Sequence, residues 1–389
     1  MTRRVLFVDH AAVLGGGELC LLDIAVGHGS ECAVALFEQG PFQSALRDAG
    51  VRVIDIDTGD SLKAIKKDSR LPGVAPLLGM LRASLRLARA ARDFDVLYAN
   101  SAKAFLASVL AGAIARRPVV WHLHDILDGE HFSGQNVRVV VRAANLRAAR
   151  VVANSTATAD AFVAVGGRRD LLRVVYNGID PAPFDSLGPA VRTEVREELG
   201  IGDDAFVVGS FSRLHPWKGQ RVFLDALASL PGVHGVIVGG ALFSGEVGYE
   251  AELRARATSA PLAGRVHMLG ARPDVPRLMK ACDVVVHTSI LPEPFGRVLV
   301  EALLAGRPLI ASNAGGVREI AKDGVTALLI SPGDSNALAS AIVELLDNPD
   351  RARTVAEAGN ADVRRRFTRE AMIEGVERVL HEVVASSPP

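Results

Sequence analysis

Short apolar runs, often β-branched, alternate with helical patterns along the whole chain, and this alternation constrains the fold more than any other feature. The runs are almost continuously apolar, as in strands buried on both faces. Seven come first: RVLFVD, ECAVALF, VRVIDID, DVLYAN, RPVVWHLH, ARVVANS and LRVVYNG. Six follow: AFVVGSFS, HGVIVGG, RVHMLG, CDVVVHTS, RPLIAS and ALLIS. The pattern predicts an α/β protein with two parallel, Rossmann-like sheets.

The stretch between the two series, residues 177–190, is rich in Pro, Gly and Asp and marks a domain boundary. We therefore predict domains at 1–183 and 184–367. The remaining segment, 368–389, carries a helical pattern but no strand for that helix to cover. A chain of 389 residues that is 49% hydrophobic can bury two such cores.

Charge and cysteine content argue against several classes of protein. Lys plus Arg and Asp plus Glu each number 44, so the whole-chain charge gives no sign of a nucleic-acid partner. Cys20, Cys32 and Cys282 show no metal-ligand spacing, so we expect neither a disulfide framework nor a zinc site. The apolar stretch at 104–115 is too short to span a bilayer, and the N-terminal apolar run is too short for a signal peptide. We expect a cytoplasmic protein.

Two strand-to-helix turns could approach a phosphate. The first is Gly15-Gly16-Gly17 before a helix opening at Glu18, but Cys20 stands where a dinucleotide fingerprint needs its third glycine. That turn is either a flexible connection between strand and helix or a site where the backbone closely approaches a ligand. The second turn carries Arg213 and Lys218-Gly219; two cations beside a helix start suit a diphosphate, although an ordinary solvated loop would look the same.

A third place joins phosphate and sugar chemistry. The N–H groups around Phe295, Gly296 and Arg297 open a helix and can hold phosphate oxygens. Glu293 precedes this helix and Glu301 lies a little more than two turns further on, where both carboxylates can accept hydrogen bonds from sugar hydroxyls. Two carboxylates near a phosphate site suggest a nucleotide sugar.

The fourth place is the end of the strand RPVVWHLH. His122 and His124 share one face of that strand, and Asp125 begins the following loop. Each histidine could instead be structural. Two D-x-D sequences, at 55–57 and 93–95, flank strands and are more typical of turns than of a metal site.

Residues 61–92 hold eight basic side chains and one acid, and Arg82, Arg86 and Arg89 recur at helical spacing beside an apolar face. This pattern suits docking on anionic lipid at the inner face of a membrane. The pattern also suits, and somewhat better, a solvated helix whose apolar side covers the sheet.

Together these segments resemble family 4 of the retaining GT-B glycosyltransferases, also called glycosyl transferases group 1. The resemblance covers nearly the whole chain. It is carried by GGGELCLLDIA, HD after a strand, VVANS, YNGID, R-L-x-x-x-K-G, E-x7-E in EPFGRVLVEALLAGRPLIAS, NAGGVREI and DGVTALLISPGD. It implies two Rossmann-like domains facing each other across a cleft, the first binding an acceptor and the second a nucleotide sugar, with the final helix returning to the first.

The resemblance also implies roles for matching residues. Glu293 and His124 would contact the donor sugar, and Arg213 and Lys218 the diphosphate, as the catalytic set. The donor-binding set would comprise Glu301, Phe295, Gly296, Arg297, Val298, Arg272, Gly16 and Gly17, and the acceptor-side set Gly15, Glu18 and Asp125.

Two positions depart from the family pattern: Ser212 replaces a frequent glycine, and Arg297 replaces an apolar residue and either adds charge near the phosphates or points to solvent. The implied activity is retaining transfer from a nucleoside diphosphate sugar to a hydroxyl acceptor, with no metal or other cofactor and with UDP as the first nucleotide to consider. The rivals are a nucleotide-sugar epimerase and a catalytically idle nucleotide-sugar-binding protein.

Overall fold

The computed structural model describes residues 3–56, 74–129 and 132–386, which form two compact units. Unit 1 comprises Met1–Gly178 with Arg369–Pro389, and unit 2 comprises Ile179–Thr368. The division lies between 178 and 179 and not between 183 and 184, because the Ile179 amide donates to the Phe367 carbonyl (3.0 Å) and so anchors the entering chain to unit 2.

Unit 1 is built on a seven-stranded parallel sheet with the order β3-β2-β1-β4-β5-β6-β7. Its strands are β1 Val5–Asp9, β2 Cys32–Leu36, β3 Arg52–Asp55, β4 Val96–Ala99, β5 Val119–Leu123, β6 Arg150–Ala153 and β7 Leu172–Val174. Its helices are α1 Gly16–His28, α2 Pro41–Asp48, α3 Val74–Ala91, α4 Ala102–Ala115, α5 Gly134–Arg147, α6 Thr156–Ala164 and α16 Arg369–Ala385.

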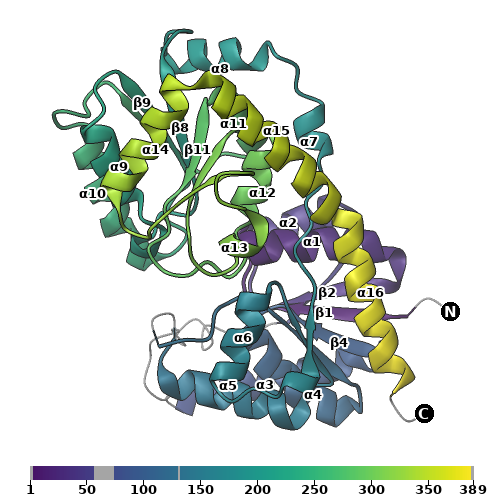
Figure 1. Cartoon of the computed structure of the whole chain (residues 1–389). Helices are drawn as coiled ribbons and strands as arrows, with labels where there is room; N and C mark the ends of the chain where they lie inside the picture. The colour runs from purple at the N-terminus through teal and green to yellow at the C-terminus, as the bar shows by residue number, and fades with distance from the viewer. Residues whose placement is uncertain (1–2, 57–73, 130–131, 387–389) are drawn as a thin grey trace. The chain divides into compact units, whose positions relative to one another are not determined.

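Helices lie on both faces of this sheet (Figure 1), and apolar side chains are buried on each face. Helices α3 to α6 contribute to one buried cluster, which includes Leu87, Phe105 and Phe162. Helices α1, α2 and α16 contribute to the other, so the last helix buries Met372 and Leu380 beside the sheet of unit 1.

Unit 2 repeats the design with a six-stranded parallel sheet, order β10-β9-β8-β11-β12-β13. Its strands are β8 Phe206–Phe211, β9 Val233–Val238, β10 Val266–Gly270, β11 Val284–His287, β12 Leu309–Ser312 and β13 Leu328–Ile330. Its helices are α7 Ala182–Asp185, α8 Val191–Leu199, α9 Gln220–Ala228, α10 Val247–Ala257, α11 Val275–Ala281, α12 Arg297–Leu304, α13 Val317–Ile320, α14 Ser335–Asp347 and α15 Pro349–Arg366. The two predicted parallel sheets are confirmed.

Strand order also shows where each unit can bind a ligand. In unit 1 the chain runs outward from β1 in one direction and from β4 in the other, and β8 and β11 form the same junction in unit 2. Open parallel sheets bind ligands beyond the carboxyl ends of the strands at such a junction. Among the described residues, no helix has both the length and the apolarity needed to cross a membrane.

Candidate functional site

The carboxyl ends of β8 and β11 bring together segments that are far apart in sequence. Arg213 follows β8 by two residues, and the turn Pro216–Lys218 leads to Gly219, which caps α9. Beyond β11 the chain continues through Ser289 to Glu293 before α12 begins. The junction of unit 2 therefore carries three of the four predicted catalytic residues.

Gly219 allows these two loops to meet. Its φ is +70°, and a Cβ at this position would lie 1.9 Å from the carbonyl oxygen of Thr288. The loops are joined by two hydrogen bonds, from the Thr288 hydroxyl to the Lys218 carbonyl (3.0 Å) and from the Ile290 amide to the Trp217 carbonyl (2.8 Å). The Lys-Gly pair thus sets Lys218 directly against the loop that carries Glu293.

Lys218 and Glu293 form a largely buried ion pair. The ammonium donates to both carboxylate oxygens, at 2.9 and 2.7 Å, and lies 4.0 Å from the centre of the Trp217 ring. Oε2 of Glu293 also lies 3.0 Å from Nε2 of His287 and accepts from the Ser289 hydroxyl (3.0 Å). Three side chains, Lys218, His287 and Ser289, therefore hold the carboxylate of a residue that is only 7% exposed.

The cluster keeps Glu293 ionised. Burial alone would raise its pKa, but the charge of Lys218 and the hydrogen bond from His287 outweigh burial and hold the pKa well below its ordinary value. Burial lowers the pKa of Lys218, and the charge of Glu293 partly offsets that effect. Lys218 is predicted to bind phosphate and Glu293 to bind sugar hydroxyls. In this structure the two side chains contact each other directly.

Helix α12 begins at Arg297, with a glycine and no polar side chain at its N-cap. Gly296 caps it with φ of +96°, and a Cβ there would meet the Leu299 side chain at 2.4 Å. Glu301 lies in the second turn and is 3.8 Å from Nε of Arg297, whose side chain is 13% exposed. Arg297 therefore does not point to solvent. Val298 is half-buried in the first turn of the same helix.

Two side chains of the predicted donor-binding set, Phe295 and Arg272, and Arg213 of the predicted catalytic set contact other residues. Phe295 packs edge-on against Phe367 in the interior of unit 2, so only its backbone can serve a ligand. Arg272 follows β10 and is tied to Asp274 (2.7 Å) and Glu198 (3.3 Å), which leaves its backbone for contact with a base. Arg213 is within 3.4 Å of Glu246.

In unit 1, a chain of hydrogen-bonded polar groups holds His124, which we predict to contact the donor sugar. Asp9 ends β1, accepts from the Asn100 side-chain amide (2.6 Å), and is fully buried. The Asn100 amide also donates to the Gly17 carbonyl (3.1 Å), and its oxygen faces Nε2 of His124 (2.8 Å). Since the Asn100 nitrogen donates to Asp9, its oxygen must accept, and the proton lies on Nε2 of His124.

The glycine turn differs from its prediction in one respect. Helix α1 begins at Gly16 and not at Glu18, because the Glu18 carboxylate turns back and accepts the Gly15 amide (3.1 Å). Burial, together with repulsion from Asp9 and Asp125, raises the pKa of Glu18 to about 8. Glu18 therefore caps the helix, and Gly16 and Gly17 lie inside its first turn.

Sequence reasoning missed Asp9, Asn100, His287 and Ser289. All four lie at or just beyond the ends of strands at the two junctions, and strand order would have singled them out. One aspartate of each D-x-D sequence has a structural partner: Asp95 accepts from the Arg4 amide (2.9 Å), and Asp55 accepts from Gln43. Asp57 lies outside the described residues.

Family models match both units. Residues 21–178 match the glycosyl transferase 4-like domain, and residues 191–362 match glycosyl transferases group 1. Among solved structures, HepE of Anabaena in complex with UDP and glucose is 40% identical, with a TM-score of 0.90, over 97% of this chain and 99% of that one. A second HepE structure contains UDP-glucose.

Curated relatives match over shorter stretches. The lipopolysaccharide core biosynthesis mannosyltransferase LpsB of Rhizobium meliloti is 30% identical over 211 residues, 52% of this chain and 59% of that protein. The D-inositol 3-phosphate glycosyltransferase of Mycolicibacterium smegmatis is 31% identical over 215 residues, 54% of this chain and 48% of that protein. The chain thus spans about half the length of the curated relatives that it matches. By its two family matches and its likeness to HepE, the chain belongs to the glycosyl transferases group 1 family and has the GT-B fold.

Proposed function

We propose that the protein is a retaining glycosyltransferase that moves a sugar from a nucleoside diphosphate sugar to a hydroxyl acceptor, and that UDP-glucose is the first donor to test. The observation that carries the proposal is the buried cluster of Glu293, Lys218, His287 and Ser289 beside the start of α12. The HepE complexes with UDP-glucose, at 40% identity over nearly the whole chain, support this donor.

In this proposal, unit 2 binds the donor. The N–H groups at the start of α12 and the cations Arg213 and Lys218 hold the diphosphate. Glu301 accepts from the ribose hydroxyls, and the backbone at Arg272 contacts the base. A donor phosphate competes with Glu293 for Lys218, so donor binding loosens the ion pair and frees carboxylate lone pairs for sugar hydroxyls.

The proposed chemistry breaks the bond between the anomeric carbon and the phosphate oxygen as the acceptor oxygen attacks from the same face. The leaving phosphate takes the acceptor proton. Negative charge builds on that phosphate, and preorganised cations and N–H groups stabilise charge that develops in the transition state. Glu293 positions the sugar and does not attack it, because its Oε2 is already engaged by three neighbours.

Unit 1 supplies the acceptor side in this proposal. The Asp9–Asn100–His124 chain fixes the orientation of the imidazole that would contact the donor sugar. The turn from Gly15 to Gly17 and the loop at Asp125 would line the acceptor. With cations from unit 2 neutralising the leaving group, we expect transfer to proceed in the presence of a chelator.

A thermal-shift comparison of UDP, GDP, ADP and dTDP, each with its glucose conjugate, tests the donor first, because ligands that bind the folded state raise apparent stability. We expect UDP-glucose to stabilise most. Release of UDP on adding glycan, lipid-linked and small-molecule hydroxyl acceptors then tests transfer. Conversion of the donor to an isomeric nucleotide sugar would identify an epimerase, and donor binding with no UDP release from any acceptor would identify an idle binding protein.

We also propose that α3 contacts anionic lipid. Residues 61–73 lie outside the described residues, but α3 carries Arg82, Arg86 and Arg89 of the basic segment. It buries Ala83, Leu87 and Ala88 and exposes Leu81 (44%) and Leu85 (42%). The exposed leucines alternate with the exposed Arg82, Arg86 and Arg89. A helix that covers the sheet and still presents apolar and basic side chains outward favours lipid docking over a merely solvated face.

A further inference from the structure

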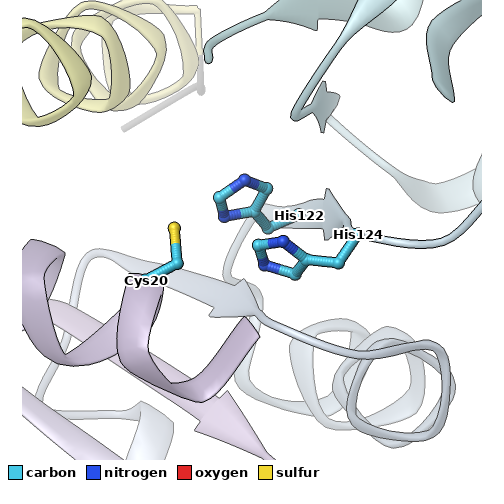
Figure 2. Close-up of side chains that lie close together, drawn as sticks. All are labelled: Cys20, His122 and His124. Atoms are coloured by element: carbon cyan, nitrogen blue, oxygen red, sulfur yellow. The ribbon is translucent and has the colours of Figure 1, made fainter. Parts of the chain in front are cut away.

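Three potential metal ligands meet in unit 1. Cys20 lies in the second turn of α1, His122 lies in β5, and His124 follows the end of β5. One ligand atom from each lies within 4.8 Å of the other two. Figure 2 shows the thiol rising from the helix and both imidazoles extending from the end of the strand. Helix packing brings together residues about one hundred positions apart, which explains why sequence spacing gave no sign of a site.

His122 is the observation that points to a cation. It is fully buried, and its Nδ1 lies 2.9 Å from the Tyr98 hydroxyl. Its Nε2 is buried without a hydrogen-bond partner, which is costly for a polar atom. A cation on Nε2 would select the tautomer in which Nδ1–H donates to Tyr98, the arrangement usual for metal-bound histidine.

The other two ligands fit the same cation. Cys20 is fully buried, and its thiol lies 3.2 Å from Oδ1 of Asn177 and 3.4 Å from Sδ of Met372. His124 is half-buried, and in this arrangement its Nε2 bonds to Asn100 (2.8 Å). One thiolate and two imidazoles suit zinc, with a fourth position for solvent.

We propose that Cys20, His122 and His124 bind one zinc ion, and that the bound ion withdraws His124 from the donor sugar and so inhibits transfer. The ring centroids of the two histidines are 3.9 Å apart and inclined by 38°. Two imidazoles bound to one tetrahedral ion lie further apart than this, so one of the two rings must rotate when the ion binds. The half-buried ring of His124 turns and leaves Asn100. The cysteine proton goes to solvent. The inhibition rests on the proposed function, but the binding does not.

Cobalt titration of the full-length, reduced, metal-free chain tests the binding. We expect one Co²⁺ per chain, with the near-ultraviolet thiolate charge-transfer band and visible bands of a tetrahedral ion, displaced by Zn²⁺. Cys20→Ser should lose the charge-transfer band and His122→Gln should bind markedly more weakly. Cys282→Ser removes a buried thiol from unit 2 and should titrate like the wild type. Wild-type and Cys20→Ser chains with the same spectrum, or no band in the wild type, would overturn the site. If His122→Gln does not fold, Cys20→Ser alone decides.

Turnover of UDP-glucose tests the inhibition. Zn²⁺ should inhibit the wild type and Cys282→Ser, a chelator should restore both, and Cys20→Ser should remain active at the same zinc concentration. Equal inhibition of Cys20→Ser would overturn the inhibitory role. If the chain transfers no sugar, the proposed function fails while the cobalt spectrum still reports on the site.

Discussion

At the scale of single residues, the hydrogen bonds around Glu293 decide how its carboxylate can act. Lys218, His287 and Ser289 all contact Oε2, and Lys218 also contacts Oε1. A carboxylate that is stabilised and fixed in this way is a poor nucleophile but a well-placed acceptor for hydroxyl groups. We therefore propose that His287 acts through Glu293 as a positioning residue.

His287→Phe removes the ring N–H beside Glu293 while filling much of the same space. A hydrogen bond to a charged group contributes about 1.5–3 kcal/mol, so kcat should fall about ten- to a hundredfold with a smaller change in KM for the donor. Steady-state kinetics check this. His234→Phe, on β9 of the same sheet, is the control for loss of a ring. An equal fall in both variants would assign the effect to packing.

Glu18 should make stability depend on pH. Its pKa is about 8 in the folded chain and ordinary, 4.5, when unfolded, so the folded state holds the proton more tightly. The stability of the wild type should therefore decrease as the pH rises from 4.5 to about 8. Glu18→Gln should remove that decrease. The advantage of the variant should grow from pH 5 to about 8 and then level off. Urea unfolding at several pH values measures it, with the exposed Glu374→Gln as control. A constant difference across this range would contradict the assignment.

At the scale of elements, glycines let the loops of unit 2 approach closely enough to assemble the cluster. Gly219 meets Thr288, and Gly315, with φ of +62°, meets the backbone of Glu293, which also accepts the Gly316 amide (2.7 Å). Backbone contacts thus hold the loop that carries Glu293 on both sides. These contacts fix the position of its side chain.

Gly219→Ala should lose stability and donor binding together. The left-handed backbone costs about 1–3 kcal/mol for a side chain, and the new Cβ also forces the Thr288 loop away. Gly232→Ala has a similar φ of +88° with nothing within 4 Å, so it should lose stability alone. Thermal unfolding with and without UDP-glucose separates the two. Equal ligand-induced shifts in both variants would mean that the close approach does not position Lys218.

Helix α3 should carry the chain to lipid. In flotation with vesicles rich in anionic lipid, we expect the wild type to rise with the vesicles and Arg82→Glu/Arg86→Glu to remain at the bottom. Leu146→Ser, which removes a 72% exposed leucine from α5, should behave like the wild type. A wild type that stays at the bottom would leave α3 as a solvated helix.

At the scale of the whole molecule, most strands were predictable because they are buried on both faces and therefore read as apolar runs, whereas the edge strands β3, β7 and β10 are partly exposed. The contacts between residues that are distant in sequence were not predictable. Lys218 and Glu293 are 75 residues apart in sequence. Their contact depends on the strand order and on the absence of a side chain at Gly219, which lets the two loops meet. The role of His287 was hidden because a histidine at a strand end has no distinctive neighbours in sequence. Glu18 was predicted to line the acceptor, but its bond to the Gly15 amide is decided by local turn geometry.

Calorimetric titration of UDP and UDP-glucose into the wild type, Lys218→Ala and Glu293→Gln tests the central claim most directly. Lys218→Ala should weaken both ligands by about tenfold or more, because it loses a charge-assisted bond to the diphosphate. Glu293→Gln should leave UDP within a few-fold and remove the extra affinity contributed by the sugar. Arg221→Ala, an exposed cation of α9, is the control, and unfolding curves verify that each variant is folded. Wild-type affinities for both ligands in both variants would contradict the account.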